Sequence, residues 1–230
     1  MRVKAKWALG GLVLSLGMLL SVLAAAHGVS GDDQAFILRH SGPLIGPYIY
    51  LGAKHMVTGY DHLLFLAGVM FFLYRLKEVA LYVTLFAVGH SVTLLAGVLG
   101  GFHVNSYLVD AVIGLSVAYK AFENLGGFAR LGFNPDTRIA VLFFGLFHGL
   151  GLATKLQDLQ ISNDGLVTNM ISFNVGVEIG QLLALGLILL ALNMLRASGQ
   201  FFRFAATTNV AIMCAGFVLI GYQLMGYATT

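Results

Sequence analysis

Long apolar blocks separated by short polar turns dominate the chain from residue 47 onward. Six such blocks can be delimited, at 47–75, 79–99, 107–126, 139–156, 169–195 and 205–226. A helix of roughly 18–25 apolar residues is long enough to cross a hydrocarbon core about 30 Å thick. Because lipid offers no hydrogen-bond partners to an open backbone, we expect every block to be helical. The pattern predicts an all-α, polytopic membrane protein with a six-transmembrane-helix bundle over residues 47–230.

The first 46 residues follow a different pattern. Residues 1–26 combine a basic start, an apolar stretch and three small residues before His27, which is typical of a cleavable signal peptide. An uncleaved first transmembrane helix is the alternative interpretation. Residues 27–46 are more polar, and we expect them to form a periplasmic N-terminal segment.

Basic residues in the turns predict the orientation. If the mature N-terminus is outside, the inside turns hold Arg75, Lys77, Arg130, Arg138, Arg196 and Arg203. The outside segments hold only Arg39, Lys54 and Lys155. This imbalance agrees with the positive-inside rule. It predicts a multi-pass protein of the bacterial inner membrane whose mature termini both lie in the periplasm.

Composition supports a membrane protein and excludes several other classes. Hydrophobic residues make up 58% of the 230 positions and charged residues 10%, whereas soluble domains carry about 25% charged residues. The net charge of +3 is spread over the turns, which argues against a nucleic-acid partner. A single cysteine excludes a disulfide framework and a thiolate metal cluster. Phosphate-loop, nucleophile-elbow and dinucleotide motifs are also absent from the sequence.

Four ionisable residues fall near the middle of four different predicted spans. They are His62, His90, His148 and Glu178. A charged side chain at the centre of a bilayer costs about 2.5–3.5 kcal/mol on insertion scales, so each is expected to face protein or water and to have a partner.

The first predicted span is longer than one crossing requires. It contains His55, Asp61 and His62, and the two histidines are seven residues apart, on one face of a continuous helix. Gly59 between them predicts a break, either within the membrane or where an interfacial segment turns into the crossing. Broken membrane helices generally border a cavity or a binding site.

Further polar residues could support such a site. Asn174, Glu178 and Gln181 follow a helical i, i+4, i+7 spacing, and Ser91 lies beside His90. In the third span Lys120 and Glu123 are three residues apart, with Asn124 adjacent. This spacing suits an internal ion pair.

Three interpretations of the buried histidines remain open. They could be structural residues that hold the helices in register through hydrogen bonds. They could form a transition-metal site, since imidazole and carboxylate ligands without thiolate suit nickel, cobalt, zinc or iron. They could also serve a proton relay or a membrane-embedded metal hydrolase.

Four segments resemble the HupE/UreJ family. Residues 55–66, HMVTGYDHLLFL, resemble its His-x-x-x-Gly-x-Asp-His-Leu-Leu signature. The segments GHSVTL at 89–94, FHGLG at 147–151 and FNVGVEIGQ at 173–181 match a second branch of the family. The resemblance implies a secondary permease for nickel, or for cobalt, of the kind that supplies hydrogenase and urease maturation. His55, Asp61 and His62 match the motif held to bind the ion, while Met56 stands where hydrogenase-linked members carry proline.

The residues and the resemblance together predict a metal site made by His55, Asp61, His62, His90, His148 and Glu178. Asn174, Gln181, Ser91, Glu123 and Asn124 are the expected supporting polar residues. The ion would be nickel or cobalt as the substrate of a permease. It would be zinc or iron as the cofactor of an embedded hydrolase, in which Ser91 could assist. An accessory or assembly subunit of a membrane complex is the third class considered.

Overall fold

The computed structural model describes residues 31–159, 161–197, 199 and 201–230. The predicted signal peptide therefore lies outside the described residues. Within the described residues, all regular secondary structure is α-helical. The helices are α2 (Gly31–Arg39), α3 (Ile45–Thr58), α4 (Tyr60–Met70), α5 (Leu76–Gly100), α6 (Ser106–Asn124), α7 (Gly127–Arg130), α8 (Thr137–Asp158), α9 (Leu166–Ala197) and α10 (Phe201–Thr229).

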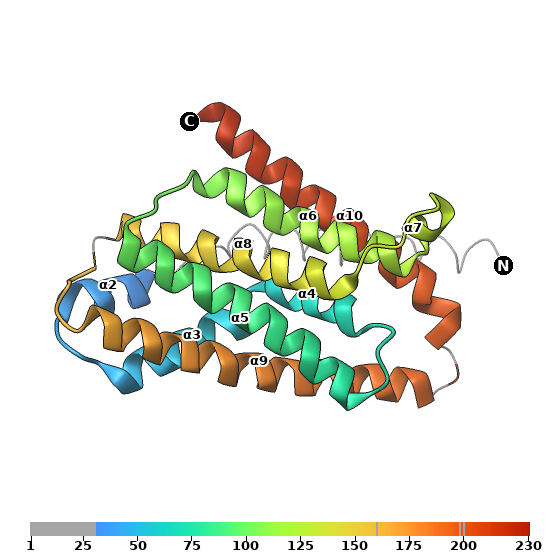
Figure 1. Cartoon of the computed structure of the whole chain (residues 1–230), viewed down its shortest axis with the longest axis horizontal. Helices are drawn as coiled ribbons and strands as arrows, with labels where there is room; N and C mark the ends of the chain where they lie inside the picture. The colour runs from blue at the N-terminus through green and yellow to red at the C-terminus, as the bar shows by residue number, and fades with distance from the viewer. Residues whose placement is uncertain (1–30, 160, 198, 200) are drawn as a thin grey trace, which may run out of the picture.

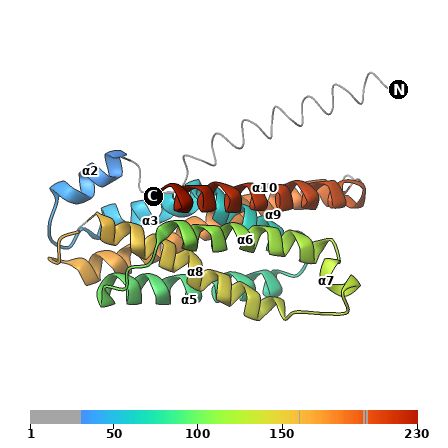
Figure 2. The same cartoon turned by 90° about the horizontal axis from the view of Figure 1, so that it is seen from above.

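The long helices run side by side along one axis, with α2 at one end of the bundle and α7 at the other (Figures 1 and 2). Four of them, α5, α8, α9 and α10, are long and apolar enough to cross a membrane. Helix α6 has 19 residues and carries three charged ones, while α3 and α4 have only 14 and 11 residues. The predicted all-helical membrane architecture is thus confirmed to the extent of four candidate spans.

Glycines allow the helices to pack closely in three pairs, α5 with α8, α3 with α9, and α6 with α10. A methyl group on Gly149 of α8 would lie 2.0 Å from the carbonyl oxygen of His90 on α5. A methyl group on Gly176 of α9 would lie equally close to the carbonyl oxygen of Ile49 on α3. In lipid, small residues at such crossings let backbones approach and gain van der Waals contact.

The two halves of the broken first segment are both tied to α9. Near the start of α3, the Asn169 side chain accepts a hydrogen bond from Leu44 N at 2.7 Å and donates one to Gly42 O at 2.9 Å. At the far end of α4, the Arg196 guanidinium donates to carbonyl oxygens that the helix end leaves open, including Phe71 O at 2.9 Å. These contacts fix α3 and α4 at their outer limits, so the break between them is held in place.

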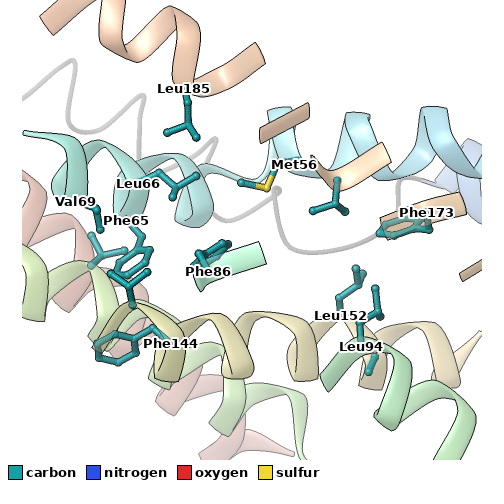
Figure 3. Close-up of a cluster of buried hydrophobic side chains, with 14 of the residues drawn as sticks. Met56, Phe65, Leu66, Val69, Phe86, Leu94, Phe144, Leu152, Phe173 and Leu185 are labelled. Carbon is teal, nitrogen blue, oxygen red and sulfur yellow. The ribbon is translucent and has the colours of Figure 1, made fainter. Parts of the chain in front are cut away.

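Buried apolar side chains of several helices form one large core cluster in the bundle, part of which Figure 3 shows. Phe65, Phe86 and Phe144 contribute to it from α4, α5 and α8. Leu94, Leu152 and Phe173 contribute from α5, α8 and α9.

Candidate metal centre

Helices α3 and α4 meet at Gly59, which has an extended backbone with φ −74° and ψ 94°. The predicted break at this residue is confirmed. The chain stays ordered across it, because Gly59 N donates to His55 O at 2.9 Å and Gly59 O accepts from Leu63 N at 3.1 Å. A methyl group on Gly59 would lie 2.7 Å from His62 Nδ1. Glycine is therefore needed to let the His62 ring lie against the break.

The break brings two histidines of one segment together. In a continuous helix, His55 and His62 would be separated by a rise of about 10.5 Å. In the structure their ring centroids are only 5.1 Å apart. The seven-residue spacing thus produces a close pair instead of two rings about two helical turns apart.

Two further helices each add a histidine to this pair. His148 on α8 lies 4.7 Å from His62 between ring centroids, and His90 on α5 lies 5.9 Å from His62 and 6.4 Å from His55. His62, His90 and His148 are buried, and His55 is partly buried. Four imidazoles from α3, α4, α5 and α8 therefore share one region of the interior.

The donor atoms are close enough to share an ion. One group consists of His55, His62 and His90, and a second of Asp61, His62 and His148, each with donor atoms within 4.8 Å of one another. Metal–nitrogen bonds of about 2.1 Å place opposite ligands about 4.2 Å apart across an ion. Small side-chain adjustments would thus suffice to form a coordination sphere, with His62 common to both groups.

Hydrogen bonds orient two of the rings. His148 Nδ1 donates to Phe144 O at 2.7 Å, because a carbonyl can only accept, and this leaves Nε2 with a lone pair. His62 Nδ1 lies 3.0 Å from Asp61 Oδ1, an arrangement in which the carboxylate accepts the ring proton. Carboxylate and carbonyl partners of this kind fix the tautomer of metal-binding histidines and raise their basicity.

Several buried nitrogens have no hydrogen-bond partner among the described residues. They are His62 Nε2 and both ring nitrogens of His90. Leaving a buried polar atom unsatisfied costs about 1–3 kcal/mol. Coordination of a cation would satisfy atoms that the protein leaves unsatisfied, which is the feature that most clearly distinguishes this cluster from a structural hydrogen-bond network.

Aromatic rings surround the histidines. Phe86 and Phe65 lie 4.9 and 5.7 Å from His148, and Phe173 lies 5.9 Å from His55, between ring centroids. These three phenylalanines belong to the apolar core, so the histidine cluster lies within that core. This apolar shell strengthens electrostatic interactions inside it.

The polar residues predicted on α9 separate into two environments. Asn174 is buried, and neither its amide oxygen nor its nitrogen has a hydrogen-bond partner among the described residues. Gln181 is also buried and donates to Val83 O on α5 at 3.3 Å. Glu178, expected as a metal ligand, is exposed on the surface of α9 and belongs to neither donor group. Its position lies just outside the face that α9 packs against its neighbours.

The other supporting residues also lie outside the donor groups. Ser91 is partly buried. The predicted Lys120–Glu123 ion pair is confirmed at 3.0 Å, and Asn124 donates to Gly68 O on α4 at 2.8 Å. These contacts lie near the C-terminal end of α6, where the Asn124 hydrogen bond joins α6 to α4.

Thr93 is a residue of the centre that the sequence analysis missed. Thr93 follows His90 by three residues on α5, and its hydroxyl donates to Leu146 O on α8 at 2.6 Å. The contact holds the two helices that carry His90 and His148 against each other. The sequence feature that could have identified Thr93 is its position in the GHSVTL segment, which also contains His90.

A family model described as HupE / UreJ protein matches residues 31–230, nearly the whole chain. Neither the curated proteins nor the solved structures include a significant match.

Proposed function

The chain belongs to the HupE/UreJ family, and we propose that it is a permease for a divalent transition-metal ion, nickel or cobalt, in the bacterial inner membrane. The observation that carries the proposal is the convergence of four imidazoles with Asp61 inside a helical bundle. A supply of metal to hydrogenase or urease maturation is the physiological setting that the family suggests.

A six-span arrangement is consistent with the helix lengths. The 19 residues of α6 measure about 28 Å, and α3 and α4 together supply one broken crossing. The predicted inside residues Arg75, Arg138 and Arg203 lie in turns or helix starts at the α7 end of the bundle, and Lys155 lies toward the α2 end (Figure 1). The α7 end is accordingly proposed to face the cytoplasm.

The chemistry of the cluster suits a permeating ion. A channel or carrier must replace the water of an ion and yet release it again. Neutral imidazoles bind nickel and cobalt well, and one carboxylate compensates part of the charge. Because His62 belongs to both donor groups, an ion could pass from one group to the other without losing all its ligands.

A lipid hydrolase would require access from the bilayer to the metal. The structure has a lateral groove with a volume of about 330 Å³ beside the break. It is lined by apolar residues of α3, α4 and α9 and by Tyr60 of α4. Among the described residues, none of the candidate ligands lines this groove. This groove therefore brings a bilayer lipid to none of the candidate ligands.

Metal accumulation in cells tests the proposal. We expect cells that express the protein to accumulate more nickel or cobalt, and His62→Ala and Asp61→Asn to abolish the gain at equal membrane abundance. His40→Ala is the matched control, because His40 is exposed and its ring contacts Phe36 of its own segment. Normal accumulation by both site variants would refute the assigned site and favour an accessory role.

A further inference from the structure

A second buried carboxylate lies between the metal centre and the α2 end of the bundle. Asp110 on α6 is only 4% exposed, and its Oδ2 accepts from Lys155 Nζ on α8 at 2.7 Å. Its other oxygen, Oδ1, is buried without a hydrogen-bond partner among the described residues. Burying a carboxylate oxygen without a hydrogen-bond partner is energetically costly.

The ion pair at the opposite end of α6 provides a comparison. There, Glu123 uses both oxygens, one with Lys120 and the other with the Thr137 hydroxyl. That pair is complete and braces the helices. The Asp110–Lys155 pair is incomplete, since one carboxylate oxygen is buried but unused.

The unused oxygen faces α8 close to the metal centre. A methyl group on Gly151 would lie 3.3 Å from Asp110 Oδ1. Gly151 is three residues after His148, a rise of about 4.5 Å along the helix. Asp110 therefore lies about one helical turn from the four-histidine cluster, on the way to the α2 end.

A second carboxylate lies on the same face of α8 as Lys155, within reach of the lysine side chain. Asp158 is three residues further along α8, is exposed, and accepts from His103 Nε2 at 2.8 Å in the structure. Side chains at i and i+3 are neighbours on a helix surface. The long, flexible lysine can thus exchange Asp110 for Asp158 by moving outward.

We propose that Asp110 is a second cation site, which relays ions between the α2 end and the histidine centre. In the absence of a cation, the Lys155 ammonium occupies this site. An arriving divalent cation takes the place of the Lys155 ammonium on Asp110, and Lys155 moves to Asp158. The inference rests on the proposed permease function and adds a step to it. It assigns to Asp110 a cation-binding role and to Lys155 the role of a displaceable counter-ion.

Cobalt(II) binding to the detergent-purified protein tests this relay. Removing the lysine charge in Lys155→Gln should expose the site, so that at cobalt concentrations too low to displace Lys155 in the wild type the variant binds one cobalt equivalent more. The additional equivalent should disappear in the double variant Lys155→Gln/Asp110→Asn. Asp110→Asn alone should retain the binding at the histidine centre but take up cobalt severalfold more slowly in cells at low cobalt concentration. Glu123→Gln, the matched carboxylate in the complete pair, should leave the cobalt stoichiometry unchanged.

The outcomes separate the relay from the permease proposal. If wild type binds cobalt through His62 but Lys155→Gln gains no equivalent, the relay is wrong and the permease proposal stands. If Asp110→Asn takes up cobalt at the wild-type rate, the relay is likewise overturned. Asparagine preserves the shape of aspartate, so this uptake result is decisive even where Lys155→Gln does not fold. If wild type binds no cobalt while Lys155→Gln gains an Asp110-dependent equivalent, the histidine centre fails and the cation site at Asp110 remains.

Discussion

Replacing Gly59 by alanine perturbs the metal centre without touching a proposed ligand. The new methyl group would lie 2.7 Å from His62 Nδ1 and 3.3 Å from Asp61 Oδ1. Comfortable non-bonded contacts are about 3.5–4.0 Å. The His62 ring must therefore retreat by about 1 Å, which breaks its 3.0 Å contact with Asp61. The backbone φ of −74° suits alanine, so the change acts on the side chains and not through backbone strain.

Loss of a hydrogen bond that orients a metal-binding histidine typically lowers metal affinity about 10–100-fold. We expect this loss in Gly59→Ala, equivalent to about 1.4–2.7 kcal/mol. Nickel titration of the purified protein by calorimetry measures it directly. Gly46→Ala is the matched control, because a methyl group there meets nothing within 4 Å. Wild-type nickel affinity in Gly59→Ala would show that the Asp61–His62 contact does not organise the centre.

Three further predictions concern packing, pH and the ion pair of α6. Gly149→Ala should destabilise the protein by about 1–3 kcal/mol, since its methyl group overlaps the His90 carbonyl; denaturation in mixed detergent, with Gly186→Ala at an open position as control, measures the difference. Nickel affinity should fall as the pH falls, because protonated imidazoles cannot bind a metal; titrations between pH 8 and about pH 5.5 check this, and a flat profile would contradict histidine ligation. Glu123→Gln should lower the unfolding temperature while nickel affinity stays at the wild-type value, because Glu123 is outside both donor groups; a loss of affinity would place Glu123 in the site.

The sequence predicted the helical architecture and the burial of three histidines for identifiable physical reasons. Apolar blocks long enough for a bilayer delimit helices well, because the backbone has no other way to satisfy its hydrogen bonds in lipid. His62, His90 and His148 could be assigned to the interior because a buried ionisable group must face protein. The break at Gly59 was predictable from the length of the first block and its glycine.

Other features depend on packing that periodicity does not describe. Glu178 shares a helical spacing with Asn174 and Gln181, but that spacing does not reveal where the packed face of α9 ends. Helix α2 was expected only as a polar segment, and it gains support from tertiary contacts such as the 2.8 Å ion pair between Asp33 and Lys54. The hydrogen bonds that orient His62 and His148 likewise require coordinates.

The second cation site shows the same limit. Asp110 and Lys155 are 45 residues apart in the chain, and no local pattern connects them. Their pairing follows from the approach of α6 to α8 at Gly151.

Metal analysis of the detergent-purified protein, wild type beside His62→Ala, distinguishes a permease from an embedded metalloenzyme and from a structural role. In titrations with nickel, cobalt and zinc, we expect reversible binding of nickel or cobalt that dialysis removes and that His62→Ala abolishes. Stoichiometric zinc or iron that survives dialysis would contradict transport and indicate an embedded metalloenzyme. Absence of metal binding in both the wild type and His62→Ala would contradict the metal centre itself and leave the histidines a structural role.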